Sequence, residues 1–214
     1  FGNNKELRDA YVTALMSADD PYPLLILGET GTGKEIITKT IHEFSGRREN
    51  NFQTLNLAAV PETLFESEIS GALKGAATGI SSRLGLFLSA CGNKKLGYKV
   101  LNDKIEFIGT GGKKKEPDPD ELKKVGGTAF LDEINSIPSF LQAKLLRIIE
   151  ENEVRVLGED RVRKFSVKVI CASNVNLEEK VKLGEFRQDL YYRISGQVIN
   201  LPSLRDMKES IFPI

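Results

Sequence analysis

The chain has 214 residues with 30 basic and 30 acidic side chains, so its formal net charge at pH 7 is zero. This length suits one domain, or one large domain with an elaboration, and it is sufficient to bury a hydrophobic core. The balanced charge gives no global indication of a nucleic-acid-binding or membrane-binding protein, although it leaves room for a local patch. No apolar run approaches membrane-spanning length and no signal-peptide pattern opens the chain, so we expect a cytoplasmic protein without a membrane partner.

Five short apolar runs alternate with helix-patterned segments and predict strands. The runs are Leu24–Leu27, Phe52–Leu57, Thr128–Asp132, Val167–Ala172 and Val198–Leu201. The helical period is clearest around Leu141–Glu150, where Ile137, Leu141, Leu145, Ile148 and Ile149 share one face. Strands that alternate with helices predict an α/β fold with a five-stranded, largely parallel sheet flanked by helices. In such a sheet the ligand lies at the carboxyl ends of the strands.

A glycine-rich loop follows the first predicted strand and precedes a helical segment. It consists of Gly28, Glu29, Thr30, Gly31, Thr32, Gly33, Lys34 and Glu35. The glycines allow a tight turn whose N–H groups face an anion, and Lys34 can reach the terminal phosphates of a nucleotide. A chance glycine turn is the alternative interpretation. Glu35 departs from the general pattern, because a magnesium-binding Ser or Thr is usual at that position.

The remaining reactive side chains give weaker signals. Cys91 and Cys171 lie far apart with no partner at metal-ligand spacing, which argues against a zinc site or a disulfide framework and fits a reducing cytoplasm. The single histidine, His42, falls in the helical segment after the glycine-rich loop. We expect it on the helix surface, without a catalytic role.

The rhythm of strands and helices breaks between about residues 89 and 124, where the sequence becomes polar and lysine-rich. Within this stretch Tyr98–Leu101 and Lys104–Ile108 flank Asn102-Asp103, which predicts a β-hairpin. We interpret the stretch as a surface insertion with a small hairpin and a flexible arm. A mobile, solvated loop is the favoured interpretation, and a docking element for a partner is the alternative.

A second signal for phosphate chemistry is the apolar strand that ends in Asp132 and Glu133. Asp132 at a strand end can hold Mg²⁺ directly or through water, and Glu133 can polarise an attacking water. Alone, an Asp-Glu pair is also consistent with a plain helix start. Together with the glycine-rich loop, the pair predicts ATP hydrolysis with Mg²⁺ as cofactor.

Four motifs in order resemble one known family, the AAA+ ATPase domain of sigma-54-dependent transcriptional activators, also called bacterial enhancer-binding proteins. The motifs are GETGTGKE, the GAATGI stretch from Gly75 to Ile80, GGTAFLDEI, and GEFRQDLYYRI at 184–194. The resemblance runs from about Gly2 to the end and is interrupted by the 89–124 insertion. It implies that residues 1–214 form the α/β subdomain of an AAA+ P-loop ATPase, and it makes Glu35 a mark of the family.

The resemblance also implies roles for single residues. Asn56 resembles the asparagine that holds the catalytic glutamate in an inactive pose, and Asn174 resembles the sensor I residue that registers the γ-phosphate. Arg187 and Arg193 resemble the arginines offered to the ATP of a neighbouring subunit, which implies a ring, in this family a hexamer. The alternative for both arginines is pairing with nearby carboxylates such as Asp189.

The loop that contacts sigma-54 reads GAFTGA in the family, and here it is Gly75, Ala76, Ala77, Thr78, Gly79 and Ile80. Ala77 replaces the aromatic residue, and truncation at a loop tip removes most of an interface anchor. The motifs for ATP hydrolysis match the family well, so we expect ATPase activity. The resemblance implies sigma-54 RNA polymerase as the partner, although the partner loop departs from the family at Ala77. The alternatives are an ATPase that serves another partner, and a nucleotide-dependent interaction module without useful turnover.

The segment from Leu201 to Ile211 resembles the approach to the family's small helical lid. We expect the lid, the regulatory domain and the DNA-binding domain to lie outside these residues, in a longer protein. DNA binding is accordingly not assigned to this chain.

Overall fold

The computed structural model describes residues 4–76, 81–114 and 117–206. Its centre is a parallel sheet in the order β12-β1-β11-β8-β2. The five strands are β1 (Leu24–Leu27), β2 (Phe52–Asn56), β8 (Thr128–Asp132), β11 (Lys168–Ser173) and β12 (Gln197–Asn200). All five predicted strands are confirmed, each to within one residue at either end. The expected α/β fold with a parallel sheet is therefore confirmed as well.

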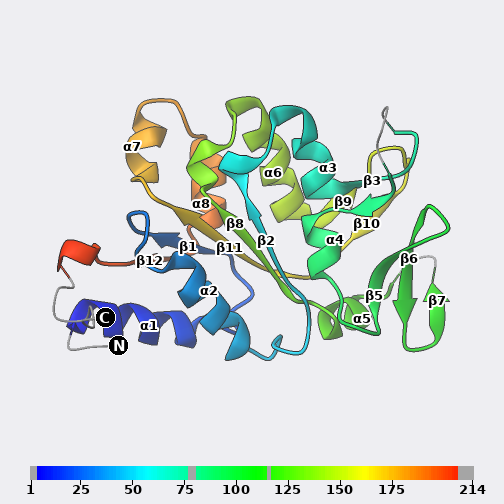
Figure 1. Ribbon diagram of the computed structural model, residues 1–214, viewed down its shortest axis with the longest axis horizontal. Coiled ribbons are helices and arrows are strands. Elements are labelled where there is room, and N and C mark those ends of the chain that lie inside the picture. The colour runs from blue at the N-terminus through cyan, green and yellow to red at the C-terminus, as the bar shows by residue number, and fades with distance from the viewer. Residues whose placement is uncertain (1–3, 77–80, 115–116, 207–214) are drawn as a thin grey trace.

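Helices cover both faces of this sheet (Figure 1). The helices are α1 (Lys5–Met16), α2 (Lys34–Glu43), α3 (Phe65–Ser70), α4 (Leu86–Ala90), α5 (Pro119–Lys124), α6 (Ser139–Glu151), α7 (Leu177–Lys182) and α8 (Gln188–Ile194). Figure 1 shows α1 and α2 on one face, and α3, α6 and α8 on the other. Short 3₁₀ helices lie at Leu57–Ala59, Glu62–Leu64, Ile134–Ser136 and Leu204–Asp206.

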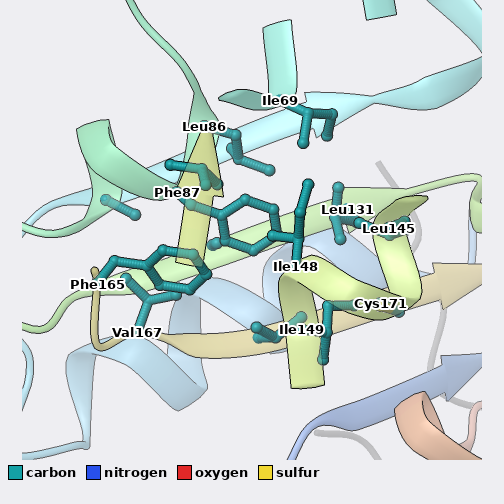
Figure 2. Packing of buried hydrophobic residues seen from close by; sticks show 14 of the residues in the cluster. Ile69, Leu86, Phe87, Leu131, Leu145, Ile148, Ile149, Phe165, Val167 and Cys171 are labelled. Atoms are coloured by element: carbon teal, nitrogen blue, oxygen red, sulfur yellow. The ribbon is translucent and has the colours of Figure 1, made fainter. Parts of the chain in front are cut away.

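Successive strand residues point to opposite faces, so the strands contribute to two separate hydrophobic clusters. Leu24 and Ile26 join the cluster under α1 and α2, whereas Leu25 joins the larger cluster under α4 and α6. In the larger cluster Phe87 is fully buried and stacks on Phe165, with ring centroids 4.7 Å apart (Figure 2). The predicted apolar face of α6 is buried there too, which confirms its helical period.

Smaller strands form hairpins beside the main sheet. They are β3 (Gly71–Ala72), β4 (Arg83–Leu84), β5 (Gly97–Leu101), β6 (Lys104–Gly109), β7 (Gly112–Lys114), β9 (Glu153–Arg155) and β10 (Val162–Lys164). The predicted hairpin is confirmed as β5 and β6, which pair in antiparallel register. Asn102 and Asp103 have φ values of 50° and 57°. A two-residue hairpin turn of this kind requires positive φ at both positions.

The expectation of a mobile, solvated insertion between residues 89 and 124 is wrong for the described residues. Tyr98, Ile105 and Phe107 are buried in the larger hydrophobic cluster. The segment expected to be a flexible arm contains α5, whose Leu122 joins the same cluster. Alternation along β6 buries Ile105, Phe107 and Gly109, and the polar, lysine-rich sequence around this strand hid the pattern.

His42 is also placed differently from the expectation, because it is buried rather than on the helix surface. Its Nδ1 lies 2.9 Å from Thr128 Oγ1, and its ring contacts Phe52 with centroids 5.2 Å apart. Burial lowers the pKa of the imidazole. His42 therefore anchors α2 to the start of β8 and the neighbouring strand, and it lies at the opposite end of β8 from Asp132.

Candidate nucleotide-binding site

The glycine-rich loop connects the end of β1 to the start of α2. Gly31 and Gly33 have φ values of 87° and 90°, a region that side chains other than glycine rarely occupy. A Cβ at Gly28 would lie only 2.8 Å from Thr32 Oγ1 and 3.0 Å from Leu201 Cβ. Glycine is thus required at all three positions, twice for backbone conformation and once for close packing.

Lys34 is the first residue of α2, and its buried side chain turns back over the loop. Its ammonium donates to the carbonyl oxygens of Gly28, at 2.7 Å, and Glu29, at 3.0 Å. Burial lowers the pKa of Lys34, and the carboxylates of Asp132 and Glu133 oppose that shift. A cation is therefore held at the N-terminal end of a helix, where both the charge and the free N–H groups attract an anion.

Asp132 and Glu133 lie at the carboxyl end of β8, half-buried. The Glu133 N–H donates to Asp132 Oδ1 at 2.9 Å. Glu133 has φ 52° and ψ 47°, a left-handed conformation that is uncommon for a residue with a side chain. Such conformations cost on the order of 1–3 kcal/mol and cluster at functional sites, so Glu133 is a residue held in position by its surroundings.

Asn174 follows β11, the strand that lies between β1 and β8. It lines a cavity of about 590 Å³ together with Gly28 and Glu29 of the glycine-rich loop. Its Oδ1 atom is buried and has no hydrogen-bond partner among the described residues. A buried polar atom without a partner is rare in proteins and indicates a group that is satisfied by something else, such as water or a ligand.

Asn56 is the last residue of β2 and pairs in register with Asp132 on β8. Its Oδ1 accepts the Ala58 N–H at 2.9 Å, which begins the 3₁₀ helix Leu57–Ala59. Within the described residues no hydrogen bond joins Asn56 to Glu133. The sheet therefore brings the predicted asparagine beside the acidic pair, while its side chain contacts its own backbone.

The two predicted finger arginines differ in their surroundings. Arg187 is exposed and forms a two-pronged ion pair with Asp189, at 3.0 and 2.7 Å. Asp189 raises the pKa of Arg187, and Arg187 lowers the pKa of Asp189. Arg193 is half-buried and donates from Nη2 to the Ile149 carbonyl near the end of α6, at 3.0 Å. Among the described residues, the predicted alternative of carboxylate pairing thus applies to Arg187 but not to Arg193.

Part of the predicted partner loop can be described. Gly75 has φ 89°, and the Ala76 N–H donates to the Leu73 carbonyl at 3.1 Å. Ala77, Thr78, Gly79 and Ile80 lie outside the described residues. The base of the loop is tied to the β9–β10 connection, because Leu73 donates its N–H to the Leu157 carbonyl at 2.9 Å.

One contact at the glycine-rich loop was not predicted from sequence. Arg205, in the 3₁₀ helix Leu204–Asp206, forms a two-pronged ion pair with Glu29, at 2.8 and 2.6 Å. A Cβ at Gly31 would lie 3.5 Å from Leu204 Cδ1. The segment after β12 therefore lies beside the loop. In sequence, the opposite charges of Arg205 and Glu29 were the only indication of this ion pair, and the spacing of the two residues gave none.

Comparison with known proteins places this geometry in a family. The model of the sigma-54 interaction domain matches residues 1–95 and 110–200. The chain belongs to the sigma-54 interaction domain family. The family model leaves residues 96–109 unmatched. This gap coincides with the hairpin of β5 and β6.

Similar proteins include a limonene hydroxylase from Geobacillus stearothermophilus, 41% identical over 97% of this chain and 32% of that protein. A Nif-specific regulatory protein from Azospirillum brasilense is 40% identical over 89% of this chain and 25% of that protein. The chain thus spans about a quarter to a third of these relatives. The chain is also similar to the structure of NtrX from Brucella abortus in complex with ATP, with a TM-score of 0.70 and 23% sequence identity. The match covers 95% of this chain and 38% of the NtrX chain, and it shows that the two share a fold.

With the family shown, the chain is an AAA+ P-loop domain of the type found in sigma-54-dependent regulators. The expected resemblance is therefore confirmed. Within the described residues, no helix is long and apolar enough to cross a membrane.

Proposed function

We propose that this sigma-54 interaction domain binds and hydrolyses Mg²⁺·ATP within a ring of identical subunits and uses the cycle to remodel sigma-54 RNA polymerase. The observation that carries the proposal is the meeting of three neighbouring strand ends. β1 supplies the glycine-rich loop with Lys34, β11 supplies Asn174, and β8 supplies Asp132 and Glu133. A phosphate cradle, a carboxylate pair and an amide oxygen without a partner in the described part of the chain then share one edge of the sheet.

The residues present fit a nucleotide and its metal. Loop N–H groups and the Lys34 ammonium suit the phosphates, and in the bound state Lys34 exchanges its two carbonyl acceptors for phosphate oxygens. Mg²⁺ takes oxygen ligands and usually only one or two protein carboxylates, and Asp132 is the carboxylate in place for it. When bound, Mg²⁺ neutralises charge that develops on the transferring phosphoryl group.

Glu133 is proposed as the general base. Its carboxylate accepts a proton from the water that attacks the γ-phosphorus, while the bond from phosphorus to the bridging oxygen breaks. The side-chain amide of Asn174 donates a hydrogen bond close to the same phosphate. Asn56, whose side chain here caps the 3₁₀ helix Leu57–Ala59, is proposed to turn to Glu133 and hold that carboxylate away until a partner engages. Arg187, with its exposed guanidinium, is the finger proposed to reach the ATP of the neighbouring subunit.

Two substitutions test the hydrolytic part. Glu133→Gln is expected to reduce phosphate release by about 10²–10⁴-fold and to leave nucleotide affinity nearly unchanged, because the amide keeps the shape but accepts no proton. Lys34→Ala is expected to weaken ATP binding itself. Phosphate release and binding of a fluorescent ATP analogue measure the two effects. The matched control is Lys39→Ala, which removes an exposed cation paired with Glu35 on the same helix.

Normal turnover in Glu133→Gln would remove Glu133 from the mechanism. Unchanged ATP affinity in Lys34→Ala would refute the phosphate-binding role of the loop. The third possibility, an interaction module without turnover, is supported only if the unsubstituted chain binds ATP and releases no phosphate.

A second candidate is an ATPase of this family that acts on a partner other than sigma-54. The observation that favours it is Ala77 at the position of the aromatic residue in the partner loop. Capture of purified sigma-54 in the presence of ADP and a metal-fluoride mimic of the transferring phosphate distinguishes the two. Capture by the native chain supports the first candidate. Capture by Ala77→Phe alone supports the second.

A further inference from the structure

The turn of the β5–β6 hairpin contacts the two segments that lead into and out of the partner loop, residues 75–80. β3 precedes this loop and β4 follows it, and the two strands pair in antiparallel register. β4 also contacts β5, and Figure 1 shows the hairpin and β3 on the same side of the molecule. The family model leaves the hairpin unmatched and matches β3 and β4. The contact therefore joins the insertion to a part of the domain that the family model describes.

Asp103, in the hairpin turn, contacts the chain on both sides of the partner loop. Its Oδ2 atom lies 3.6 Å from the Nζ atom of Lys74, which directly precedes the loop. Its carbonyl oxygen accepts a hydrogen bond at 3.2 Å from the hydroxyl of Ser82, two residues after the loop. The Lys74 N–H donates in turn to Ser82 Oγ at 2.9 Å. One residue of the hairpin thus links the two ends of the loop.

The body of the hairpin is anchored in the protein core, close behind this turn. Ile105 is buried, and its carbonyl oxygen accepts a hydrogen bond from Arg163 Nη2 at 2.6 Å. Tyr98, on the paired strand, is buried as well, and its hydroxyl donates to the Lys164 carbonyl at 2.5 Å. Ile105 is only two positions from Asp103. The turn is therefore attached to a fixed part of the fold.

The turn carries an aspartate at a position where glycine is usual. Asn102 and Asp103 have φ values of 50° and 57°. Two-residue turns of this kind favour Asn-Gly or Asp-Gly, because glycine adopts positive φ without steric cost. A side chain that is kept in such a conformation is a feature found at functional sites. Here that side chain supplies the carboxylate that faces Lys74.

We propose that the β5–β6 hairpin is a positioning element for the partner loop, with Asp103 as the positioning residue. It holds Lys74 and Ser82 together, so that the loop leaves the domain from a fixed base. The inference rests on the proposed function, which assigns partner contact to residues 75–80. The hairpin adds a second support to the one that the loop base receives from the β9–β10 connection through Leu157.

Hydrogen exchange of the Lys74 N–H, followed by NMR on the 214-residue chain, measures how firmly the base of the loop is held. Asp103→Gly is expected to raise the exchange rate by about 1.5- to 5-fold, the range that corresponds to loss of an exposed ion pair. Glycine suits the turn, so this variant keeps the fold. Ser82→Ala is expected to raise the rate by about 2- to 12-fold, because the N–H loses its acceptor. The matched control is Asn102→Gly, which alters the same turn and keeps the Asp103 carboxylate.

Salt distinguishes the ion pair from a general loosening of the turn. At 1 M NaCl the Debye length falls to about 3 Å, so the exposed pair of Lys74 and Asp103 is screened. The exchange rate of the native chain is then expected to approach that of Asp103→Gly. Equal rates in these two proteins at low salt, an equal increase in Asn102→Gly, or a difference that salt does not reduce would each overturn the proposal.

Capture of purified sigma-54 with ADP and the metal-fluoride mimic tests the consequence for the partner. Asp103→Gly is expected to weaken capture by about 1.5- to 5-fold and to leave phosphate release at the native level, because Asp103 lies outside the nucleotide site. Native capture together with a changed exchange rate would overturn the role toward the partner. Absence of capture by the unsubstituted chain would instead refute sigma-54 as the partner, and the exchange rate at Lys74 would then decide the positioning role alone.

Discussion

Lys168 is a buried lysine that ties two parts of the fold together. It lies at the start of β11 with 1% of its surface exposed. Its ammonium donates to three backbone carbonyls in the segment from α1 to β1, those of Ser17 at 3.2 Å, Asp20 at 2.8 Å and Tyr22 at 2.7 Å. We predict that Lys168→Met, which keeps the length of the side chain and removes the charge, destabilises the chain by about 2–4 kcal/mol.

The magnitude follows from the fate of the three carbonyls. Ser17 keeps a partner, because its carbonyl also accepts the Asp20 N–H at 3.2 Å. Asp20 and Tyr22 lose the ammonium, and each unpaired carbonyl costs about 1–3 kcal/mol. Water reaches part of this exposed turn and reduces that cost. Removing a charge from the interior also recovers desolvation energy, so the loss stays below the simple sum.

The assay is urea unfolding of the native chain and Lys168→Met at several pH values. Burial lowers the pKa of Lys168 from 10.5 to about 8. Between these values the unfolded chain binds more protons than the folded chain, so the native chain gains stability as the pH rises, by up to about 3 kcal/mol. Lys168→Met lacks this titration. The stability difference between the two proteins is therefore expected to widen from pH 8 to pH 10.5. A difference that narrows instead would refute the reasoning, because it would mean that the three carbonyls outweigh burial and raise the pKa.

Three further predictions concern packing, the hairpin turn and the arginines. Phe87→Ala is expected to lower the free energy of unfolding by about 3–5 kcal/mol, because a fully buried ring stacked on Phe165 is lost. A decrease below about 1 kcal/mol in denaturant titration would contradict the packing described. Asp103→Gly is expected to stabilise the chain by up to about 1 kcal/mol, because glycine adopts φ 57° without strain, and a lower unfolding midpoint would count against this account of the turn. Arg187→Ala is expected to reduce ATP turnover of the assembled ring and to leave the unfolding midpoint unchanged. Arg193→Ala is expected to lower the free energy of unfolding of the isolated chain by about 1 kcal/mol, because its hydrogen bond to the Ile149 carbonyl of α6 is lost. Equal unfolding midpoints for the two variants would show that this hydrogen bond contributes nothing.

The sheet and the nucleotide loop could be predicted because their signals are local. The central strands β1, β8 and β11 are buried on both faces and read as short apolar runs, whereas the edge strands β2 and β12 are partly exposed and are marked by shorter apolar stretches. The glycines at 31 and 33 are dictated by backbone conformation and therefore show in sequence. The roles assigned to Glu133, Asn174 and the arginines remain predictions, although the fold brings the first two to the same sheet edge.

The insertion and His42 could not be predicted because their burial depends on distant partners. Lys104 and Glu106 give one face of β6 a polar appearance, and only the packing of Phe107 beside Tyr98 shows that its other face is part of the core. His42 is buried because Thr128 and Phe52 arrive from other strands. The ion pair of Arg205 with Glu29 likewise joins residues at opposite ends of the chain. Composition and periodicity describe a segment by itself and carry no information on such contacts.

The strand order has a consequence for how the protein is made. β1, which carries the nucleotide loop, pairs on one side with β11 and on the other with β12, so that Leu24 lies opposite both Ile170 and Gln197. During synthesis the apolar run Leu24–Leu27 emerges from the ribosome long before either neighbour. At about 5–20 residues per second, the wait lasts on the order of 10 s or more. β1 remains without a partner strand throughout that time, and a nucleotide can aid folding only after nearly the whole chain has been translated.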